Sequence, residues 1–421
     1  MKFTSRFALA AALGFSVAMT GVAAPAYAAK KKDEKPAAPP IKLSDAVRKE
    51  LLPAQEALGK NDFATAQAKL DAAKAIATTP DEKYMVATLT LNLGILTKDE
   101  AKKCNAIDDM VATGKINPAE QPKFLGAAGH CAYEAKNLPK AEQAYLAAVA
   151  AGSTDQDVMA RLADTQSRNG KPADALATLQ TAIGQMTKAG TAVPTEWYAR
   201  GADIASRGKL TPQFVAITTQ WLAAYPTAQN WHDSLFIYRQ LGNLQGDVDL
   251  DLMRLSRAVG ALPLAGQATY IDYALAVYLK YPAEAVAVLN EGIKAGKLSK
   301  ATSKNTAEIL ALSEPKLPAD KASLPASVTA ANGAKATFKS VESTGDVFYG
   351  YADFAKAAEM YKLALTKPGA DLAMGNVRLG AALAQSGDKE GARAAFNAVT
   401  TGPYAVLAGY WKAYLDHPAA G

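Results

Sequence analysis

The sequence predicts an all-α fold, an α-α superhelix of repeated antiparallel helix pairs that ends in a C-terminal capping helix. Small residues recur at fixed distances from larger apolar ones, as two helices at close approach require. Short turn sequences such as RNGKP, QLGN and QSGD separate the helical segments at a regular interval. Strand-like alternation of apolar and polar residues does not compete with this pattern.

The first 28 residues are organised like a secretory signal peptide. Lys2 and Arg6 precede a short apolar run at residues 7–17, and the segment closes on Ala26-Tyr27-Ala28. We expect cleavage after Ala28 and export to the periplasm, with full secretion as the second choice. A retained membrane anchor is the alternative, although the apolar run is near the short end for crossing a bilayer of roughly 30 Å.

A Lys/Pro/Ala-rich linker, residues 29–43, follows the predicted cleavage site, and its KKKDEK run is typical of a solvated leader. Removing Lys2 and Arg6 from the 46 basic residues leaves 44 against 40 acidic ones, a net charge of +4. This near balance does not indicate a nucleic-acid partner.

No later apolar run reaches about 18 residues, so no membrane span is expected after cleavage. No cysteine precedes Cys104 to carry a lipid anchor.

An N-terminal array of repeats occupies residues 44–312, and a C-terminal pair of the same kind occupies residues 338–402. In NLPKAEQAYLAAVAAG, Ala141 is followed by Tyr145 and Ala148 and is preceded, twelve residues earlier, by Gly129. Ala175 repeats the pattern 34 residues later. Other good copies of the pattern are marked by Ala66, Ala357 and Ala392. Weaker copies are centred near Ala101, Gln213, Asp247 and Ala285.

This pattern resembles the tetratricopeptide repeat (TPR) family, whose 34-residue unit is a helix-turn-helix with small residues at the helix contact. The resemblance covers most of the chain from Ser44 to Pro403. It is looser where Gln213 and Asp247 replace a small residue and where Tyr273 stands in a first helix. The resemblance implies a superhelical scaffold that binds other proteins and has no catalytic activity.

Residues 313–337 interrupt the repeats. Three prolines, Pro315, Pro318 and Pro325, lie there among alanine, serine and lysine residues. Because the residue before a proline disfavours helical geometry, we expect an irregular connection or a poorly formed repeat that serves as a hinge.

The chain ends in one more predicted helix, Pro403–His417, within a capping segment and tail at residues 403–421. A stacked array exposes its last apolar face unless something covers it, so we expect this helix to cap the final repeat. A dimerisation face is the alternative. The apolar side chains on one face of the helix are Val406, Leu407, Tyr410, Trp411, Tyr414 and Leu415.

We find no motif for catalysis, nucleotide binding or metal binding, and the histidines lie far apart in the sequence. Asp247, Asp249 and Asp251 look like the start of a calcium loop. The sixth and twelfth positions of that loop hold Leu252 and Ala258 instead of glycine and glutamate. We therefore expect the aspartates on the solvated start of a helix, with no metal, no cofactor and no enzymatic activity. An enzyme with an unrecognised site is the less favoured alternative.

The two cysteines fall on helices that are expected to be neighbours. Cys104 lies in the second helix of one predicted unit, and Cys131 lies in the first helix of the next. An exported protein matures in an oxidising compartment, so we expect a disulfide between Cys104 and Cys131. Two buried thiols are the alternative.

The resemblance to TPR proteins also implies where a partner binds. In that family, first helices line the inner surface, at positions beside the small contact residue and one turn further on. A groove with both signs of charge and several aromatic residues suits a peptide or a helix of another cell-envelope protein. An envelope glycan or a small ligand is the alternative, and the oligomeric state is left open. The family positions in this sequence are His130, Tyr133, Glu134, Asp164, Arg168, Tyr198, His232, Phe236, Arg239 and Tyr349.

Overall fold

The computed structural model describes residues 41–419. The predicted signal peptide and residues 29–40 of the linker lie outside this range. Within it the chain forms helices α1 to α21 and the short 3-10 helices η1 (Leu262–Leu264) and η2 (Glu314–Lys316), with no β-strand. None of the helices in residues 41–419 is long and apolar enough to cross a membrane. The all-α prediction is confirmed.

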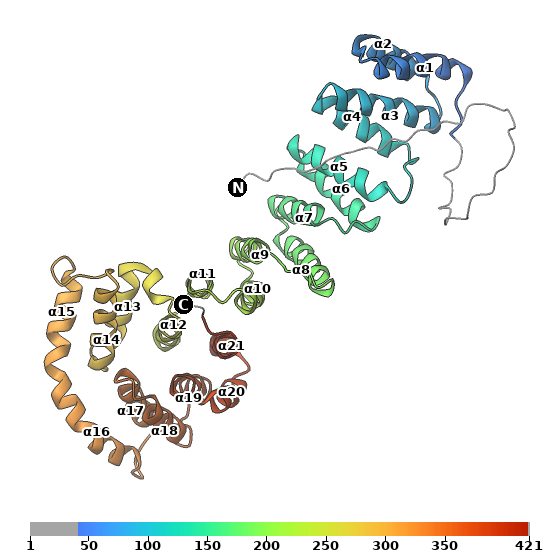
Figure 1. The fold of residues 1–421 in the computed structure, drawn as a ribbon. Coiled ribbons are helices and arrows are strands. Elements are labelled where there is room, and N and C mark those ends of the chain that lie inside the picture. The colour runs from blue at the N-terminus through green and yellow to red at the C-terminus, as the bar shows by residue number, and fades with distance from the viewer. Residues whose placement is uncertain (1–40, 420–421) are drawn as a thin grey trace, which may run out of the picture.

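Helices α1 to α10 form antiparallel pairs that stack in chain order (Figure 1). The first helices of neighbouring pairs also contact one another, α1 with α3, α5 with α7 and α9 with α11. They therefore lie on the inner side of the array, where successive pairs approach most closely. The bounds are α1 Asp45–Gly59, α2 Phe63–Ile76, α3 Pro80–Leu96, α4 Glu100–Ala112, α5 Gln121–Glu134, α6 Leu138–Ala150, α7 Gln156–Arg168, α8 Pro172–Lys188, α9 Thr195–Arg207 and α10 Thr211–Ala224.

Local sequence explains where the chain turns between two paired helices. The side chains of Asp62 and Asn137 each accept a hydrogen bond from the backbone N–H three residues later, and so begin α2 and α6. The residues just before them, Asn61 and Lys136, have φ values of 58° and 60°. A left-handed residue at this position ends the first helix and reverses the chain within a few residues.

Small residues at the helix contact confirm the repeat interpretation. A Cβ atom on Gly129 would lie 2.5 Å from Tyr145 Cδ1, and one on Gly380 would lie 2.4 Å from Phe396 Cε1. The aromatic ring of the second helix therefore fills the space that the glycine leaves. The alanine four residues after the cap of the second helix is fully buried in the regular pairs, namely Ala66, Ala141, Ala175, Ala285, Ala357 and Ala392.

The register predicted for three of the weaker copies is wrong by one or two residues. Large or charged side chains occupy the equivalent position in those pairs, so a search for small residues misplaces it. The predicted marks were Ala101, Gln213 and Asp247, and the residues four after the helix cap are Lys103, Phe214 and Asp249.

The C-terminal half closes on itself to form what we name the C-terminal ring, α11 to α21 (Figure 1). Helix α14 packs against α17, α12 packs against α19 and α21, and α10 packs against α21. One hydrophobic cluster joins α10, α12, α17, α19 and α21 across the closure, and a second contains the buried apolar side chains of α13 and α14. The bounds are α11 Ala228–Leu241, α12 Gly246–Ala258, α13 Gly266–Val277, α14 Pro282–Lys294, α15 Lys304–Ser313, α16 Leu317–Ala331, α17 Phe338–Gly350, α18 Phe354–Ala364, α19 Leu372–Ser386, α20 Lys389–Asn397 and α21 Gly402–Asp416.

Helix α21, which was predicted as a cap, covers the last pair and also joins it to the N-terminal array. The Trp411 ring stacks on Phe396 of α20 with centroids 5.9 Å apart. The Tyr410 hydroxyl lies 2.8 Å from the Thr218 hydroxyl of α10. Because Leu407, Tyr410 and Trp411 are fully buried within the chain, this face is not available to a second copy. The alternative of a dimerisation face is therefore wrong.

Most of residues 313–337, where an irregular connection or a poorly formed repeat was predicted, belong to η2 and the helix α16. Pro315 lies in η2 and Pro318 lies in the first turn of α16. Backbone N–H groups in the first turn have no partner within the helix, so proline, which lacks this group, is tolerated there. Helix α16 also continues through Pro325. Proline near a helix start favours the helix, which is why composition alone mispredicts this interval. Ala331 is the buried residue of α16, and a hinge here stays a prediction.

The aspartates predicted on a solvated helix start are mostly buried, which corrects that expectation. Asp251 is 3% exposed and accepts hydrogen bonds from Arg378 Nε at 3.0 Å. Asp249 accepts two hydrogen bonds from Arg239, while the side chain of Asp247 stays half exposed. Helix α12 lies inside the C-terminal ring, so its charged face meets α19 instead of water.

Candidate functional site

Five of the predicted partner-binding residues lie together on two first helices. Arg161, three residues before Asp164, belongs to the same group, although sequence reasoning missed it. The signal for Arg161 was its helical spacing, which places it on the same face as Asp164. We name this group the α5–α7 surface, and it consists of His130, Tyr133 and Glu134 on α5, and Arg161, Asp164 and Arg168 on α7.

Tyr133 lies at the centre of the α5–α7 surface. Its hydroxyl donates a hydrogen bond to Asp164. The guanidinium carbons of Arg168 and Arg161 lie 5.2 and 5.8 Å from the centre of its ring. Arg168 Nε also pairs with Asp164 Oδ2 at 2.9 Å. Burial, and then the hydrogen bond to Asp164, raise the pKa of Tyr133 to about 12, so the phenol keeps its proton at neutral pH.

His130 and Glu134 extend the surface along α5. Glu134 Oε1 lies 3.8 Å from His130 Nδ1 and 3.8 Å from Arg161 Nη1. Burial, with a further contribution from Arg161, lowers the pKa of His130, so the imidazole is neutral at pH 7. The side chains of Glu134 and Arg168 are 64% and 56% exposed. One acidic and one basic group are therefore accessible to a partner.

This chemistry suits binding better than catalysis. A phenol that keeps its proton up to about pH 12 is a poor nucleophile and a poor base at neutral pH. Asp164 is already engaged by Tyr133 and Arg168. An aromatic ring flanked by arginines is instead suited to contact a partner side chain. Within residues 41–419, no group of three His, Cys, Asp or Glu side chains is placed to hold a metal ion.

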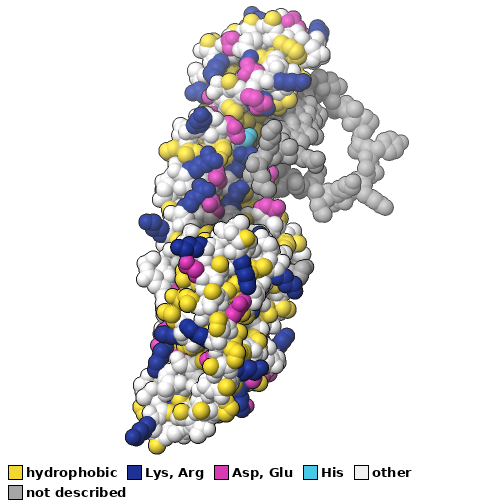
Figure 2. Space-filling view, turned by 90° about the vertical axis from the view of Figure 1, so that its left-hand side faces the viewer, with side chains coloured by type: hydrophobic (Ala, Val, Ile, Leu, Met, Phe, Trp, Pro, Cys, Tyr) yellow, Lys and Arg dark blue, Asp and Glu magenta, His cyan; other side chains and the backbone are white. Residues whose placement is uncertain are grey.

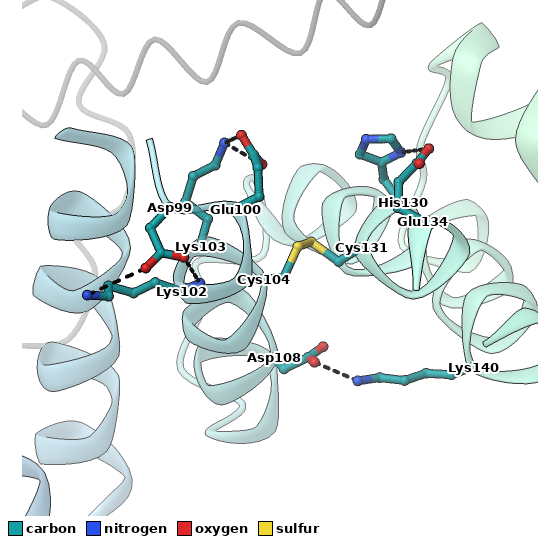
Figure 3. The surroundings of a disulfide bond; sticks show 10 residues. All are labelled: Asp99, Glu100, Lys102, Lys103, Cys104, Asp108, His130, Cys131, Glu134 and Lys140. Atoms are coloured by element: carbon teal, nitrogen blue, oxygen red, sulfur yellow. Dashed lines mark hydrogen bonds and ion pairs between the residues drawn. A yellow bond between two sulfur atoms is a disulfide. The ribbon is translucent and has the colours of Figure 1, made fainter. Parts of the chain in front are cut away.

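A disulfide ties α5 to the preceding repeat. It joins Cys131 of α5 to Cys104 of α4, whose Cα atoms lie 5.5 Å apart (Figure 3). The ion pair between Lys140 of α6 and Asp108 of α4, at 2.5 Å, crosses the same boundary. Figure 3 also shows the His130 ring beside Glu134, on the same helix as Cys131. One of the two helices that carry the α5–α7 surface is therefore covalently tied to the preceding repeat.

His232, Phe236 and Arg239 form a second cluster, on α11. The rings of His232 and Phe236 stack with centroids 5.5 Å apart. Arg239 donates hydrogen bonds of 2.6 and 2.7 Å to Asp249 of α12, so its charge is already satisfied. The three residues border a pocket between α11, α12 and α13. Because α9 lies between α7 and α11, the predicted residues do not form one continuous site.

Tyr198 and Tyr349 lie in the core and are not accessible to a partner. Tyr198 precedes Gly201, the glycine of α9 that faces Ile217 of α10, by three residues, and it lies among the buried residues of the helix. Tyr349 occupies the same position in its helix pair as Tyr133, four residues after the contact glycine. Closure of the C-terminal ring covers Tyr349. The Arg254 guanidinium carbon lies 4.6 Å from the centre of the Tyr349 ring.

Charges of both signs are mixed on the face that Figure 2 shows, with hydrophobic atoms between them. A continuous basic stripe, which nucleic-acid binding requires, is not seen on that face.

Comparisons with known proteins give structural neighbours only. No family model and no curated protein matches the chain. A tetratricopeptide repeat protein from Parabacteroides merdae is 10% identical with a TM-score of 0.30, covering 81% of this chain and 100% of that one. The pilF protein of Pseudomonas aeruginosa is 15% identical with a TM-score of 0.24, covering 63% and 97%. Part of a TPR protein from Cytophaga hutchinsonii is 12% identical with a TM-score of 0.27, covering 76% and 96%.

TM-scores this low carry no argument about function. The helix pairs of this chain, with their small contact residues and stacked first helices, themselves define it as a TPR-like helical solenoid.

Proposed function

We propose that this protein is an exported, periplasmic, non-enzymatic scaffold that binds a protein or peptide segment of the cell envelope at the α5–α7 surface. The observation that carries this proposal is the arrangement around Tyr133. Its ring lies between Arg161 and Arg168 on the side lined by first helices, and Glu134 and Arg168 extend into solvent.

The α5–α7 surface has the chemistry of a peptide contact. Tyrosine and arginine are the residues that most often dominate protein interfaces, because they bury large area and also form hydrogen bonds. Arg168 can form charge-assisted hydrogen bonds with a carboxylate or a backbone carbonyl of the partner. Glu134 offers an acceptor of opposite sign. A partner segment that carries both a basic and an acidic group would match this pair.

The packing inside the C-terminal ring supports placing the partner-binding surface on the N-terminal array. In the ring, α12, α17 and α19 fill their shared interior with the chain's own side chains, among them Arg254, Asp346 and Arg378. With respect to residues 41–419, the side chains of Glu134 and Arg168 on the α5–α7 surface stay exposed. The disulfide between Cys104 and Cys131 supports export, because disulfides persist mainly in oxidising compartments.

Affinity purification after cross-linking in intact cells tests the proposal. The informative variant combines Tyr133→Ala with Arg168→Ala, and the matched control combines Gln180→Ala with Gln185→Ala on the exposed face of α8. We expect wild type and control to enrich the same envelope protein, and the α5–α7 variant to recover at least tenfold less of it. A loss of about 1.4 kcal/mol or more corresponds to that factor. Circular dichroism must show equal helix content in all three.

Equal recovery by the α5–α7 variant and wild type contradicts the assigned surface. If no protein is enriched above background by wild type, an envelope glycan or a small ligand becomes the favoured partner. Sedimentation of the purified protein with isolated cell wall then distinguishes these two.

A further inference from the structure

Buried charges meet at the centre of the C-terminal ring. Arg254 of α12 donates hydrogen bonds of 2.7 and 2.8 Å to Glu284 of α14 and one of 2.8 Å to Asp346 of α17. Arg378 of α19 donates to Asp251 of α12 at 3.0 Å and to Asp346 at 2.9 Å. We name this group the ring cluster, which consists of Arg254, Arg378, Asp251, Glu284, Glu342 and Asp346, each no more than 3% exposed.

The ring cluster contains more negative than positive groups. Four carboxyl groups face two guanidinium groups, and Glu342 pairs with Arg378. At the edge, Lys339 lies 3.1 Å from Glu342, and the half-exposed Asp247 lies 3.0 Å from Arg378. The charges of Lys339 and Asp247 cancel each other. The carboxyl groups therefore outnumber the cationic groups by two, whether or not this edge pair is counted.

Neutral hydroxyl groups complete the surroundings and do not remove this excess. Tyr273 of α13 donates to Glu284 at 2.8 Å, and Tyr361 of α18 donates to Asp346 at 2.8 Å. Burial raises the pKa of both phenols, so they stay neutral. The other phenols near the cluster, whose pKa values burial also raises, are Tyr281, Tyr349 and Tyr404.

An excess of negative charge away from water is unfavourable, because burial and neighbouring carboxylates both disfavour the ionised form of a carboxyl group. We propose that the ring cluster takes up a proton as the pH falls from neutral into the weakly acidic range. The C-terminal ring is then closed most tightly at weakly acidic pH and loosens as the pH rises.

Asp251 is the carboxyl group of the ring cluster to which we assign this proton. Burial raises its pKa, the attraction of Arg378 and Arg254 offsets only part of this rise, and Asp346 adds to it. In an unfolded chain the pKa of an aspartate is about 3.9. The folded ring therefore binds a proton that the unfolded chain releases. This stabilisation is complete below about pH 4 and is lost as the pH rises through the folded-state pKa of Asp251.

Asp247 acts in the opposite direction at lower pH. Despite its burial, Arg378 and Lys339 lower its pKa. Its contribution to stability is therefore present at neutral pH and is lost only as the pH falls below about 4. The two effects have separate pH ranges, so Asp247 does not contribute to the change between pH 5 and pH 8.

Amide hydrogen exchange of the full chain between pH 5 and pH 8, corrected for the intrinsic exchange rate, tests this proposal. We expect the protection of amides in α12, α17 and α19 to fall as the pH rises. The fall is at most tenfold per pH unit while one proton is released. Protection in α1 to α4, which lie outside the ring, should stay constant.

Asp251→Asn supplies a permanently neutral side chain and should flatten the pH profile in α17 and α19. Asp203→Asn, on α9 beside Arg207 in an exposed pair, is the matched control and should keep the wild-type slope. If Asp251→Asn does not fold, Asp346→Asn removes a charge from the same cluster. Wild-type protection that is constant or rises from pH 5 to pH 8 would overturn the proposal. An unchanged slope in the neutral variant would also overturn it.

Discussion

Replacing Arg378 by methionine is expected to lower the free energy of unfolding by roughly 3 to 5 kcal/mol, because removing one partner of a buried ion pair leaves uncompensated charge. Arg378 donates hydrogen bonds to Asp251 at 3.0 Å and to Asp346 at 2.9 Å, and its side chain is fully buried. Methionine fills a similar volume but carries no charge. Urea unfolding followed by circular dichroism measures the loss, which should be larger at pH 8 than at pH 5.

Arg393→Met is the matched control for this experiment. Arg393 pairs with Asp416 at 2.7 Å, but both side chains are exposed to water. Exposed pairs contribute little, so we expect no measurable change in stability. Equal losses for the two arginine variants would contradict the role given to the ring cluster.

Trp411→Ala is expected to have a comparable effect, again roughly 3 to 5 kcal/mol, as for other buried aromatic residues cut to alanine. Trp411 is fully buried and packs on Phe396 and Tyr414, with ring centroids 5.9 Å away in both cases. The cavity would loosen α21 from α20 and from α10. Hydrogen exchange should therefore show faster opening in α10 as well as in α21.

A graded series separates this packing effect from general damage. Tyr410→Phe keeps the ring and removes the hydrogen bond to Thr218, so a loss of about 1 kcal/mol is expected. Leu279→Ala, at a side chain that is 69% exposed, should change nothing. If Trp411→Ala left the exchange of α10 unchanged, closure of the ring through α21 would be refuted.

The regular repeats were predictable because their signal is local. Gly129 and Tyr145 lie on consecutive helices, and the need for a small residue opposite a ring fixes their spacing. Where Phe214 or Asp249 occupies the position four residues after the helix cap, no small residue marks it, and the predicted register is wrong by one or two residues. Proline content misled the prediction for residues 313–337, since two of the three prolines there lie in the first turn of a helix.

Closure of the ring was not predictable in this way. Arg378 and Asp251 lie 127 residues apart, and no periodicity connects them. Charged residues in a single sequence are assigned to the surface by default, because they are almost never fully buried unless paired. The same closure buries Tyr349, which has the register of the accessible Tyr133. Part of the α5–α7 surface was predictable because its positions follow from repeat register alone.

Site-specific photo-cross-linking in living cells tests the central claim most directly. A photoreactive amino acid replaces Ser167 on α7, one residue from Arg168, or Thr181 on the exposed face of α8. The scaffold account predicts a discrete adduct with one envelope protein from position 167 and none from position 181. It also predicts loss of that adduct when Tyr133→Ala is added. Equal adducts from both positions, or an adduct that survives Tyr133→Ala unchanged, would contradict it.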